Sequence, residues 1–83
     1  MAIPQAIFAV AQALEQGRTL DEALDIGMEI LKKVPEIVVD YLTVRSMQLD
    51  KPPMNGSVRI LIAAHLGGVR LLDNCAATIV SGN

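Results

Sequence analysis

Residues 55–74 read Asn-Gly-Ser-Val-Arg-Ile-Leu-Ile-Ala-Ala-His-Leu-Gly-Gly-Val-Arg-Leu-Leu-Asp-Asn, and this stretch decides the fold. It starts with turn formers, continues as an apolar run, breaks at Gly67-Gly68 and resumes as a second apolar run. Two adjacent glycines between strand-like runs are a strong signal for a tight β-hairpin. We therefore predict two antiparallel strands, over 58–66 and 69–80.

A third strand is predicted upstream of this hairpin. Residues 38–45 are almost all β-branched, aromatic or aliphatic, with Asp40 and Arg45 as the charged exceptions. Residues 47–57 then gather aspartate, prolines, asparagine and glycine, which cannot continue a ladder, so we predict a loop there. Three strands joined by a loop and a tight turn predict an antiparallel meander.

The first third of the chain has the periodicity of two amphipathic helices. One apolar stripe consists of Ile3, Ile7, Val10, Ala11 and Leu14. Gly17 is suited to end this first helix, because glycine readily adopts the left-handed conformation. Thr19 and Glu22 have the spacing of a capping box, so a second helix is predicted from there to Pro35, where Gly27 would allow a close approach.

The short break between the two helices predicts that they pack side by side. A three-stranded sheet is marginally stable unless one face is covered, and the helical hairpin is the available cover. We therefore predict an α+β fold in which an N-terminal antiparallel helical hairpin packs on a three-stranded antiparallel sheet. A chain of 83 residues has room for one core, so residues 1–83 are predicted to form a single domain.

Composition excludes several classes of function. The formal charge of -2 and the presence of one Tyr, one Phe and no Trp argue against nucleic-acid binding. The apolar runs are far shorter than the roughly 20 residues that cross a bilayer, and the first residues lack the charged region of a signal peptide, so we expect a cytoplasmic protein with no membrane partner. A single cysteine, Cys75, and a single histidine, His65, exclude an internal disulfide and a Cys/His metal cluster.

Candidate catalytic groups are sparse, and we assign no catalytic residue. Asp21, Glu22 and Asp25 are the expected decoration of a helix N-terminus. Cys75 is interpreted as a small buried hydrophobe. His65 is interpreted as a solvated or surface-packed side chain, with a ligand or a base as the alternative.

Four polar residues of the predicted hairpin, Arg59, Arg70, Asp73 and Asn74, invite structural expectations. Arg59 and Arg70 flank the Gly-Gly turn and could meet a shared anion, but we expect each to pair with Asp73 or Asp40 across the sheet. Asp73-Asn74 interrupts an apolar strand, so we expect a bulge or an Asx-type turn there.

Four segments together resemble the C-terminal domain of the pantothenate synthetase, or pantoate:beta-alanine ligase, family. They are Val39-Asp40-Tyr41-Leu42, Met54-Asn55-Gly56-Ser57, the run 59–67, and Arg70-Leu71-Leu72-Asp73-Asn74. The resemblance covers nearly all of the chain, although its specific motifs lie in the second half. We assign an architectural role to the motif residues, which are Asn55, Gly56, Arg59, Gly67, Arg70, Leu72, Asp73 and Asn74. His65 departs from the arginine often found at its position, and Gly68-Val69 from a pair of small hydroxyl residues.

The resemblance implies that this chain is the lid of a larger enzyme. In the family, an N-terminal Rossmann-like domain binds ATP, pantoate and beta-alanine and forms pantoyl adenylate, which the amine attacks with release of AMP. That nucleotide-binding domain and its Ser-Ser-Arg-Asn boundary loop have no counterpart here. The resemblance therefore implies that the domain is this chain's partner, that ATP and Mg belong to the parent enzyme, and that the isolated chain is inactive and binds no cofactor.

The alternative is an independent α+β interaction module without enzymatic activity. It would recruit a partner through the uncovered face of its sheet, and it predicts an exposed apolar patch around Leu61, Ala63 and Val69. Self-association through the same patch or an edge strand is also open.

Overall fold

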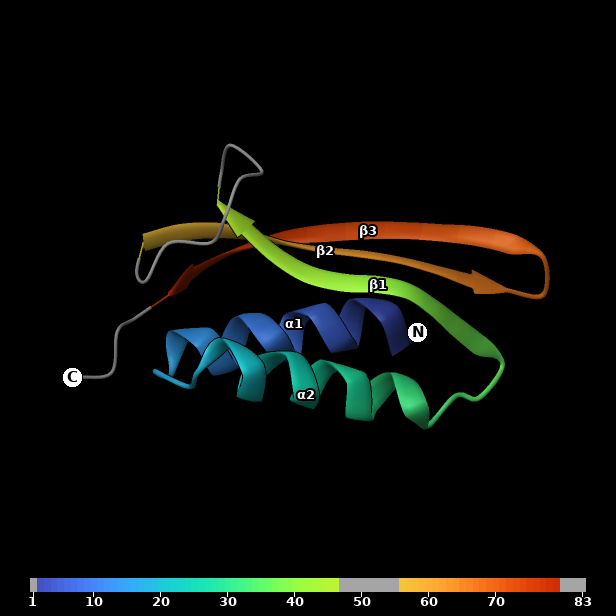
Figure 1. The fold of residues 1–83 in the computed structure, drawn as a ribbon, viewed down its shortest axis with the longest axis horizontal. Helices are drawn as coiled ribbons and strands as arrows, with labels where there is room; N and C mark the ends of the chain where they lie inside the picture. Colours follow the sequence, from blue (N-terminus) through green and yellow to red (C-terminus); the bar gives the residue numbers. More distant parts are fainter. Residues whose placement is uncertain (1, 47–55, 80–83) are drawn as a thin grey trace.

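The computed structural model describes residues 2–46 and 56–79 and has two layers. Along the chain it runs α1 (Ala2–Glu15), α2 (Leu20–Lys32), β1 (Ile37–Ser46), β2 (Gly56–Leu66) and β3 (Val69–Ile79). Figure 1 shows both helices side by side on one face of the sheet. The predicted α+β class and the helical hairpin on a three-stranded antiparallel sheet are confirmed. No helix within the described part of the chain has the length and hydropathy to cross a bilayer.

The end of α1 and the start of α2 lie where local chemistry predicts. Gly17 has φ 87°, the left-handed conformation expected just after α1. Thr19 and Glu22 form the predicted capping box, because the Glu22 N–H donates to Oγ1 of Thr19 at 3.1 Å and the Thr19 N–H donates to Oε1 of Glu22 at 3.0 Å. These reciprocal bonds satisfy two backbone donors that the helix itself leaves unpaired.

The sheet has the strand order β1-β2-β3, and the hairpin that joins β2 to β3 forms at the glycine pair. Gly67 and Gly68 have φ of 57° and 86°, so both occupy the region that tight hairpin turns require. The residues of β2 and β3 pair without interruption from Gly56 opposite Ile79 to Leu66 opposite Val69. Gly56 and Ser57 thus belong to a strand rather than to the predicted loop, and the rest of that loop, with Asn55, lies outside the described residues.

The irregularity of the sheet lies in β1 rather than at Asp73-Asn74, where it was expected. Pairing with β2 shifts between Val39 and Tyr41, so Asp40 is the extra residue of a β-bulge. Strict alternation outward from the buried Val44 would point Asp40 into the core. The bulge turns this carboxylate out and keeps Val39 and Ile37 on the inner face. The expectation for Asp73-Asn74 was wrong because two adjacent polar residues fit an edge strand that is partly open on both faces.

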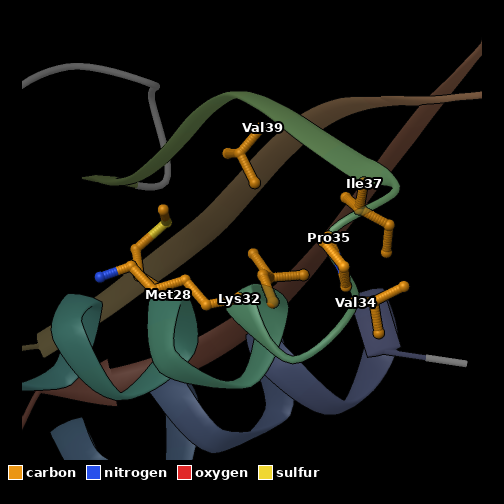
Figure 2. A pocket seen from close by; sticks show the side chains of 7 residues that line it. Met28, Lys32, Val34, Pro35, Ile37 and Val39 are labelled. Carbon is orange, nitrogen blue, oxygen red and sulfur yellow. The ribbon is translucent and has the colours of Figure 1, made fainter.

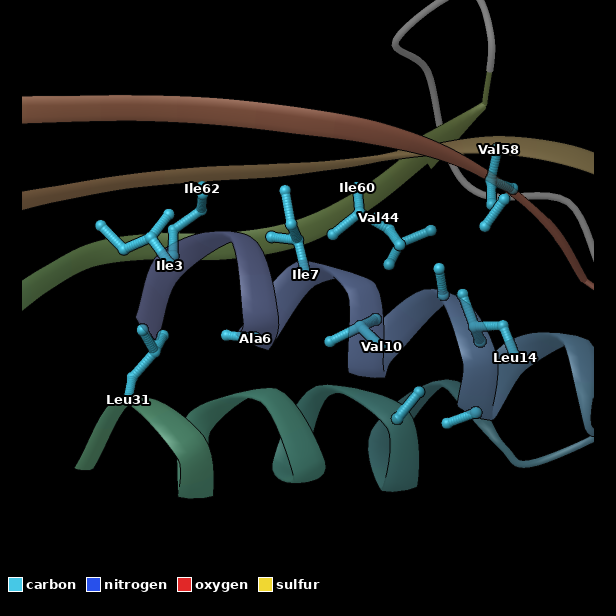
Figure 3. Close-up of a cluster of buried hydrophobic side chains, with 14 of the residues drawn as sticks. Ile3, Ala6, Ile7, Val10, Leu14, Leu31, Val44, Val58, Ile60 and Ile62 are labelled. Carbon is cyan, nitrogen blue, oxygen red and sulfur yellow. The ribbon is translucent and has the colours of Figure 1, made fainter. Parts of the chain in front are cut away.

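The core fills the space between the helices and the inner face of the sheet (Figure 3). Its largest fully buried side chains are Leu14, Leu31, Ile60, Ile62, Val10, Val44 and Val58. α1 packs mainly under β3 and α2 under β1. The prediction for Gly27 is confirmed, because a Cβ atom there would lie 2.6 Å from Cγ2 of Val10 and 3.0 Å from Cδ2 of Leu42.

Candidate functional site

The most prominent candidate is the face of the sheet that points away from the helices, which we call the outer sheet face. Val58, Ile60, Ile62 and Ala64 point into the core, so the alternate residues of β2 point outward. Strand pairing then assigns their outward neighbours on β1 and β3. The outer sheet face consists of Val38, Tyr41, Thr43, Arg45, Ser57, Arg59, Leu61, Ala63, His65, Arg70, Leu72, Asn74, Ala76 and Thr78. Both helices lie on the opposite side of the sheet (Figure 1).

An apolar row crosses the middle of this face. Tyr41 pairs with Ala63, and Ala63 pairs with Leu72, so the three side chains lie in one line across the strands. Ala63 is fully buried, whereas Tyr41 is 44% and Leu72 67% exposed. The expected patch around Leu61, Ala63 and Val69 is therefore misplaced. Ala63 lies beneath its neighbours, and Val69 lies at the hairpin end, so the exposed apolar surface centres on Tyr41 and Leu72.

Arginines border the apolar row, and their predicted ion pairs do not form. Nη1 of Arg59 donates to Oδ1 of Asn74 at 2.6 Å, and Nη1 of Arg45 donates to Oγ1 of Thr43 at 2.8 Å. Arg45 and Arg59 occupy directly opposite positions on β1 and β2. Within residues 2–46 and 56–79, Arg45, Arg59 and Arg70 form no ion pair with a carboxylate. The predicted ion pairs do not form because Asp40 lies beside His65 and Asp73 points to the helix side of the sheet.

His65 is a surface residue, as predicted, and has an acidic neighbour. Its Nδ1 lies 3.0 Å from Oδ2 of Asp40, and the two side chains are 44% and 34% exposed. In His65 and Asp40 the pair has a base and an orienting carboxylate, but a triad also needs a nucleophile within hydrogen-bond reach of the imidazole. The strand partners of His65 are Val38 and Arg70, neither of which is a nucleophile. The pair joins the bulge residue of β1 to an outward-facing side chain of β2.

Cys75 lies on the helix side of β3, in surroundings that disfavour its thiolate form. Its Sγ lies 3.7 Å from the carbonyl oxygen of Ile7 on α1. Partial burial raises the pKa of the Cys75 thiol above its ordinary value, and the negative charge of Asp73 raises it further. Because the thiolate is the nucleophilic form, this environment suppresses the chemistry of the thiol.

Seven of the eight motif residues lie on β2, on β3 or in the turn between them, and Asn55 lies outside the described residues. The bond between Arg59 and Asn74 joins two of the motif segments across β2 and β3. Gly56 and Gly67 have positive φ at the two ends of β2. Leu72 and Asn74 lie on the outer sheet face, whereas Asp73 points to the helices and accepts a bond from the Asn74 N–H at 2.8 Å. The described motif residues are thus spread along the whole of β2 and the first half of β3.

A second candidate is an apolar pocket of about 300 Å³ between the end of α2 and the start of β1 (Figure 2). It is lined by Met28, Leu31, Lys32, Val34, Pro35, Ile37 and Val39. Its one charged group is Lys32, whose Nζ is 3.3 Å from Oε2 of Glu29. Apart from Lys32, the lining holds no ionisable or hydroxyl side chain.

Within residues 2–46 and 56–79, the acidic, histidine and cysteine side chains do not gather around a common point. No group of three or more His, Cys, Asp and Glu residues able to hold a metal ion occurs among the described residues.

Comparison with known proteins places these features in a family. The sequence profile described as pantoate-beta-alanine ligase matches residues 1–76. The pantothenate synthetase of Mycobacterium sp. (strain KMS) is 42% identical over 78 residues, which are 94% of this chain and 24% of the relative. That of Paracoccus denitrificans (strain Pd 1222) is 38% identical over 79 residues, or 94% of this chain and 28% of the relative. The chain thus spans about a quarter of the length of these relatives.

A solved structure gives the same result. The crystal structure of pantothenate synthetase from Thermus thermophilus matches with a TM-score of 0.80 and 30% identity, over 89% of this chain and 28% of that chain. These comparisons confirm the resemblance that the second-half motifs predicted. The sequence did not identify Tyr41 and Arg45 as residues of the outer sheet face. Alternation counted from the start of β1 and alternation counted from its end assign these residues to opposite faces, and only the bulge at Asp40 reconciles the two.

Proposed function

Because the chain belongs to the pantoate-beta-alanine ligase family, we propose that it is the C-terminal lid domain of an ATP-dependent ligase that condenses pantoate with beta-alanine. The ligase would act through pantoyl adenylate in the cytoplasm, and this chain by itself would be inactive. The observation that carries the proposal is the open outer sheet face. Among the described residues no helix covers this face, which exposes Tyr41 and Leu72, and such a face is typical of a domain that completes its packing against a further part of the same enzyme.

The proposed division of labour follows from the groups each part supplies. ATP, Mg²⁺, pantoate and beta-alanine would bind to the larger nucleotide-binding part of the enzyme, which supplies the chemistry of adenylation. This chain would cover that site. Closing a lid over a reactive acyl adenylate excludes water and so favours attack by the amine over hydrolysis.

Rigidity is the property that such a lid needs, and the motif residues supply it. The bond between Arg59 and Asn74 braces β2 against β3, and Gly67 allows the tight hairpin that keeps both strands in register. A lid whose strands are held in one register presents the same surface at each closure.

The proposal can be tested by adding this chain to the remaining N-terminal portion of the Mycobacterium sp. (strain KMS) enzyme. AMP release that depends on pantoate, ATP and beta-alanine should rise above that of the N-terminal portion alone. The chain alone and an unrelated domain of equal size are the controls. AMP release that is unchanged by a saturating amount of the chain would argue against the lid role.

The second candidate function is an independent interaction module without activity, and the exposure of Tyr41 and Leu72 favours it as well. The two candidates differ in their partner. A stand-alone module would show no affinity for the N-terminal portion of a pantothenate synthetase, whereas a lid domain would bind it and stimulate AMP release.

A further inference from the structure

We infer that the outer sheet face is the surface through which this chain docks on the rest of the ligase, and that the surface it meets is an apolar patch bordered by carboxylates. The inference rests on the proposed function and deepens it by naming the docking face and the chemistry of its partner. Three features of the described residues carry it: an apolar centre, a basic border and a charge conflict between two arginines.

The apolar centre is the row formed by Tyr41, Ala63 and Leu72. The two outer members are among the large hydrophobic side chains most exposed to solvent, while Ala63 between them is fully buried. Protein interfaces combine an apolar, aromatic-rich centre with a polar border, and their energy is concentrated in a few central side chains. The arrangement on this face has that anatomy.

The border is basic, although the chain as a whole is acidic. Arg45 and Arg59 lie on one side of the apolar row, and His65 and Arg70 lie on the other. The exposed acidic residues of the helical layer are Glu15, Asp21, Glu22, Asp25 and Glu29. The helical layer also exposes Arg18, Lys32 and Lys33, so acidic residues outnumber basic ones there, whereas, among the described residues, the outer sheet face carries Arg45, Arg59 and Arg70 and, beside His65, the single carboxylate of Asp40.

Arg45 and Arg59 are in conflict with each other in this structure. Like charges at directly opposite positions on neighbouring strands destabilise a sheet. Both guanidinium groups are held by neutral acceptors, Thr43 and Asn74, so their charges are fixed in place without being neutralised. A carboxylate brought in by a docking partner would relieve this repulsion, which identifies the partner surface as acidic at this point.

The same charges disfavour a second copy of this chain as the occupant. A two-fold pairing of outer sheet faces would bring one basic border against another. The apolar row and the arginines therefore favour a different surface. Under the proposed function that surface belongs to the remaining three quarters of the enzyme, which this chain does not match.

The test measures binding of this chain to the N-terminal portion of the Mycobacterium sp. (strain KMS) enzyme by calorimetry. Leu72→Ser and Arg45→Glu should each weaken binding by about tenfold or more. The matched controls are Phe8→Ser, which also removes an exposed apolar side chain, and Arg18→Glu, which also reverses an exposed charge. Both controls should bind like the unaltered chain, and added salt should weaken binding of the unaltered chain more than that of Arg45→Glu.

A measurement on the unaltered chain removes the risk that a variant fails to fold. Tyr41 is the only tyrosine of the chain, so nitration of the 83-residue chain by tetranitromethane reports on this face alone. The N-terminal portion should protect Tyr41 from nitration. Undiminished nitration in the bound state would overturn the inference, as would binding that Phe8→Ser weakens and Leu72→Ser does not.

The outcomes separate this inference from the proposed function. Stimulation of AMP release that Leu72→Ser and Arg45→Glu leave intact would overturn the docking face while the lid role stands. Binding that both substitutions weaken, without any stimulation of AMP release, would support the docking face and count against the lid role. A dimer of the chain that buries Tyr41 in the absence of the partner would overturn the inference.

Discussion

Nδ1 of His65 lies 3.0 Å from Oδ2 of Asp40, and Asp40 is the residue that interrupts the pairing of β1 with β2. The bulge therefore resolves a conflict between a carboxylate and an apolar inner face. It also sets which side chains of β1 reach the outer sheet face, because Tyr41 and Val38 both point outward only when one extra residue lies between them.

Deletion of Asp40 should be tolerated. It would leave an uninterrupted ladder with Val39 and Ile37 still on the inner face, and it would remove one partly exposed side-chain contact with His65, so urea unfolding should show a loss of about 1 kcal/mol or less. Deletion of the exposed Ala76 from the other edge strand is the control. There the ladder is regular, so the deletion turns Ala77 and Ile79 outward and should cost at least about 2 kcal/mol. Equal losses would contradict the assignment of the bulge.

Gly27→Ala should destabilise the protein even though alanine is the better helix former. The gain in helix propensity is about 1 kcal/mol, but the new Cβ would lie 2.6 Å from Cγ2 of Val10, and overpacking costs about 1–3 kcal/mol. Thermal and urea unfolding measure the difference. Val10→Ala should be less damaging in the Gly27→Ala background than in the unaltered protein, because it removes the clashing methyl group. Strict additivity would mean that the two residues do not compete for space.

Thr19→Ala should lower the free energy of unfolding by about 1 kcal/mol, because it removes the oxygen that accepts the Glu22 N–H. Thr19→Ser retains that oxygen and should cost much less. Urea unfolding of the two variants makes the comparison, and similar losses would show that the methyl group of Thr19 matters more than its hydroxyl.

The raised pKa of Cys75 predicts that its thiol is alkylated slowly and that the stability of the protein depends on pH. Iodoacetamide should modify the folded protein at pH 8 more slowly than the urea-unfolded chain, because less thiolate is present in the fold. The folded thiol keeps its proton to higher pH than the unfolded one. Its contribution to stability is therefore complete below the ordinary value of 9.0 and declines as pH rises above it. Cys75→Ala should lack this part of the decline, and equal alkylation rates would contradict the burial effect.

Local signals were sufficient to predict most of the fold. Thr19 and Glu22, Gly17, and the glycine pair 67–68 each specify backbone geometry through their own chemistry, so elements bounded by them were predictable. Strand ends that lack such residues were harder to predict. Gly56 and Ser57 have the composition of a turn but pair with Ile79 and Thr78, because the long partner strand β3 overrides weak local preference.

The partners of side chains on the sheet could not be predicted in the same way. Asp73 and Asn74 both lie close to the position opposite Arg59, but alternation sends Asp73 to the helix side and leaves Asn74 as the acceptor. Which face each residue of β1 occupies depends on one inserted position, and a bulge leaves no signature beyond the misfit of Asp40. The motifs in the sequence therefore pointed to this sheet, but the side chains on its outer face could be assigned only once the strand register was known.

The proposed lid role is tested most directly by a chimera. The 78 matching residues of the Mycobacterium sp. (strain KMS) pantothenate synthetase would be replaced by those of this chain, and the rate of pantoate-, ATP- and beta-alanine-dependent AMP release compared with that of the enzyme lacking them. We predict that the chimera exceeds the truncated enzyme on the order of 100-fold, as expected when a closing element positions reactants. A folded chimera no faster than the truncated enzyme would contradict the lid role.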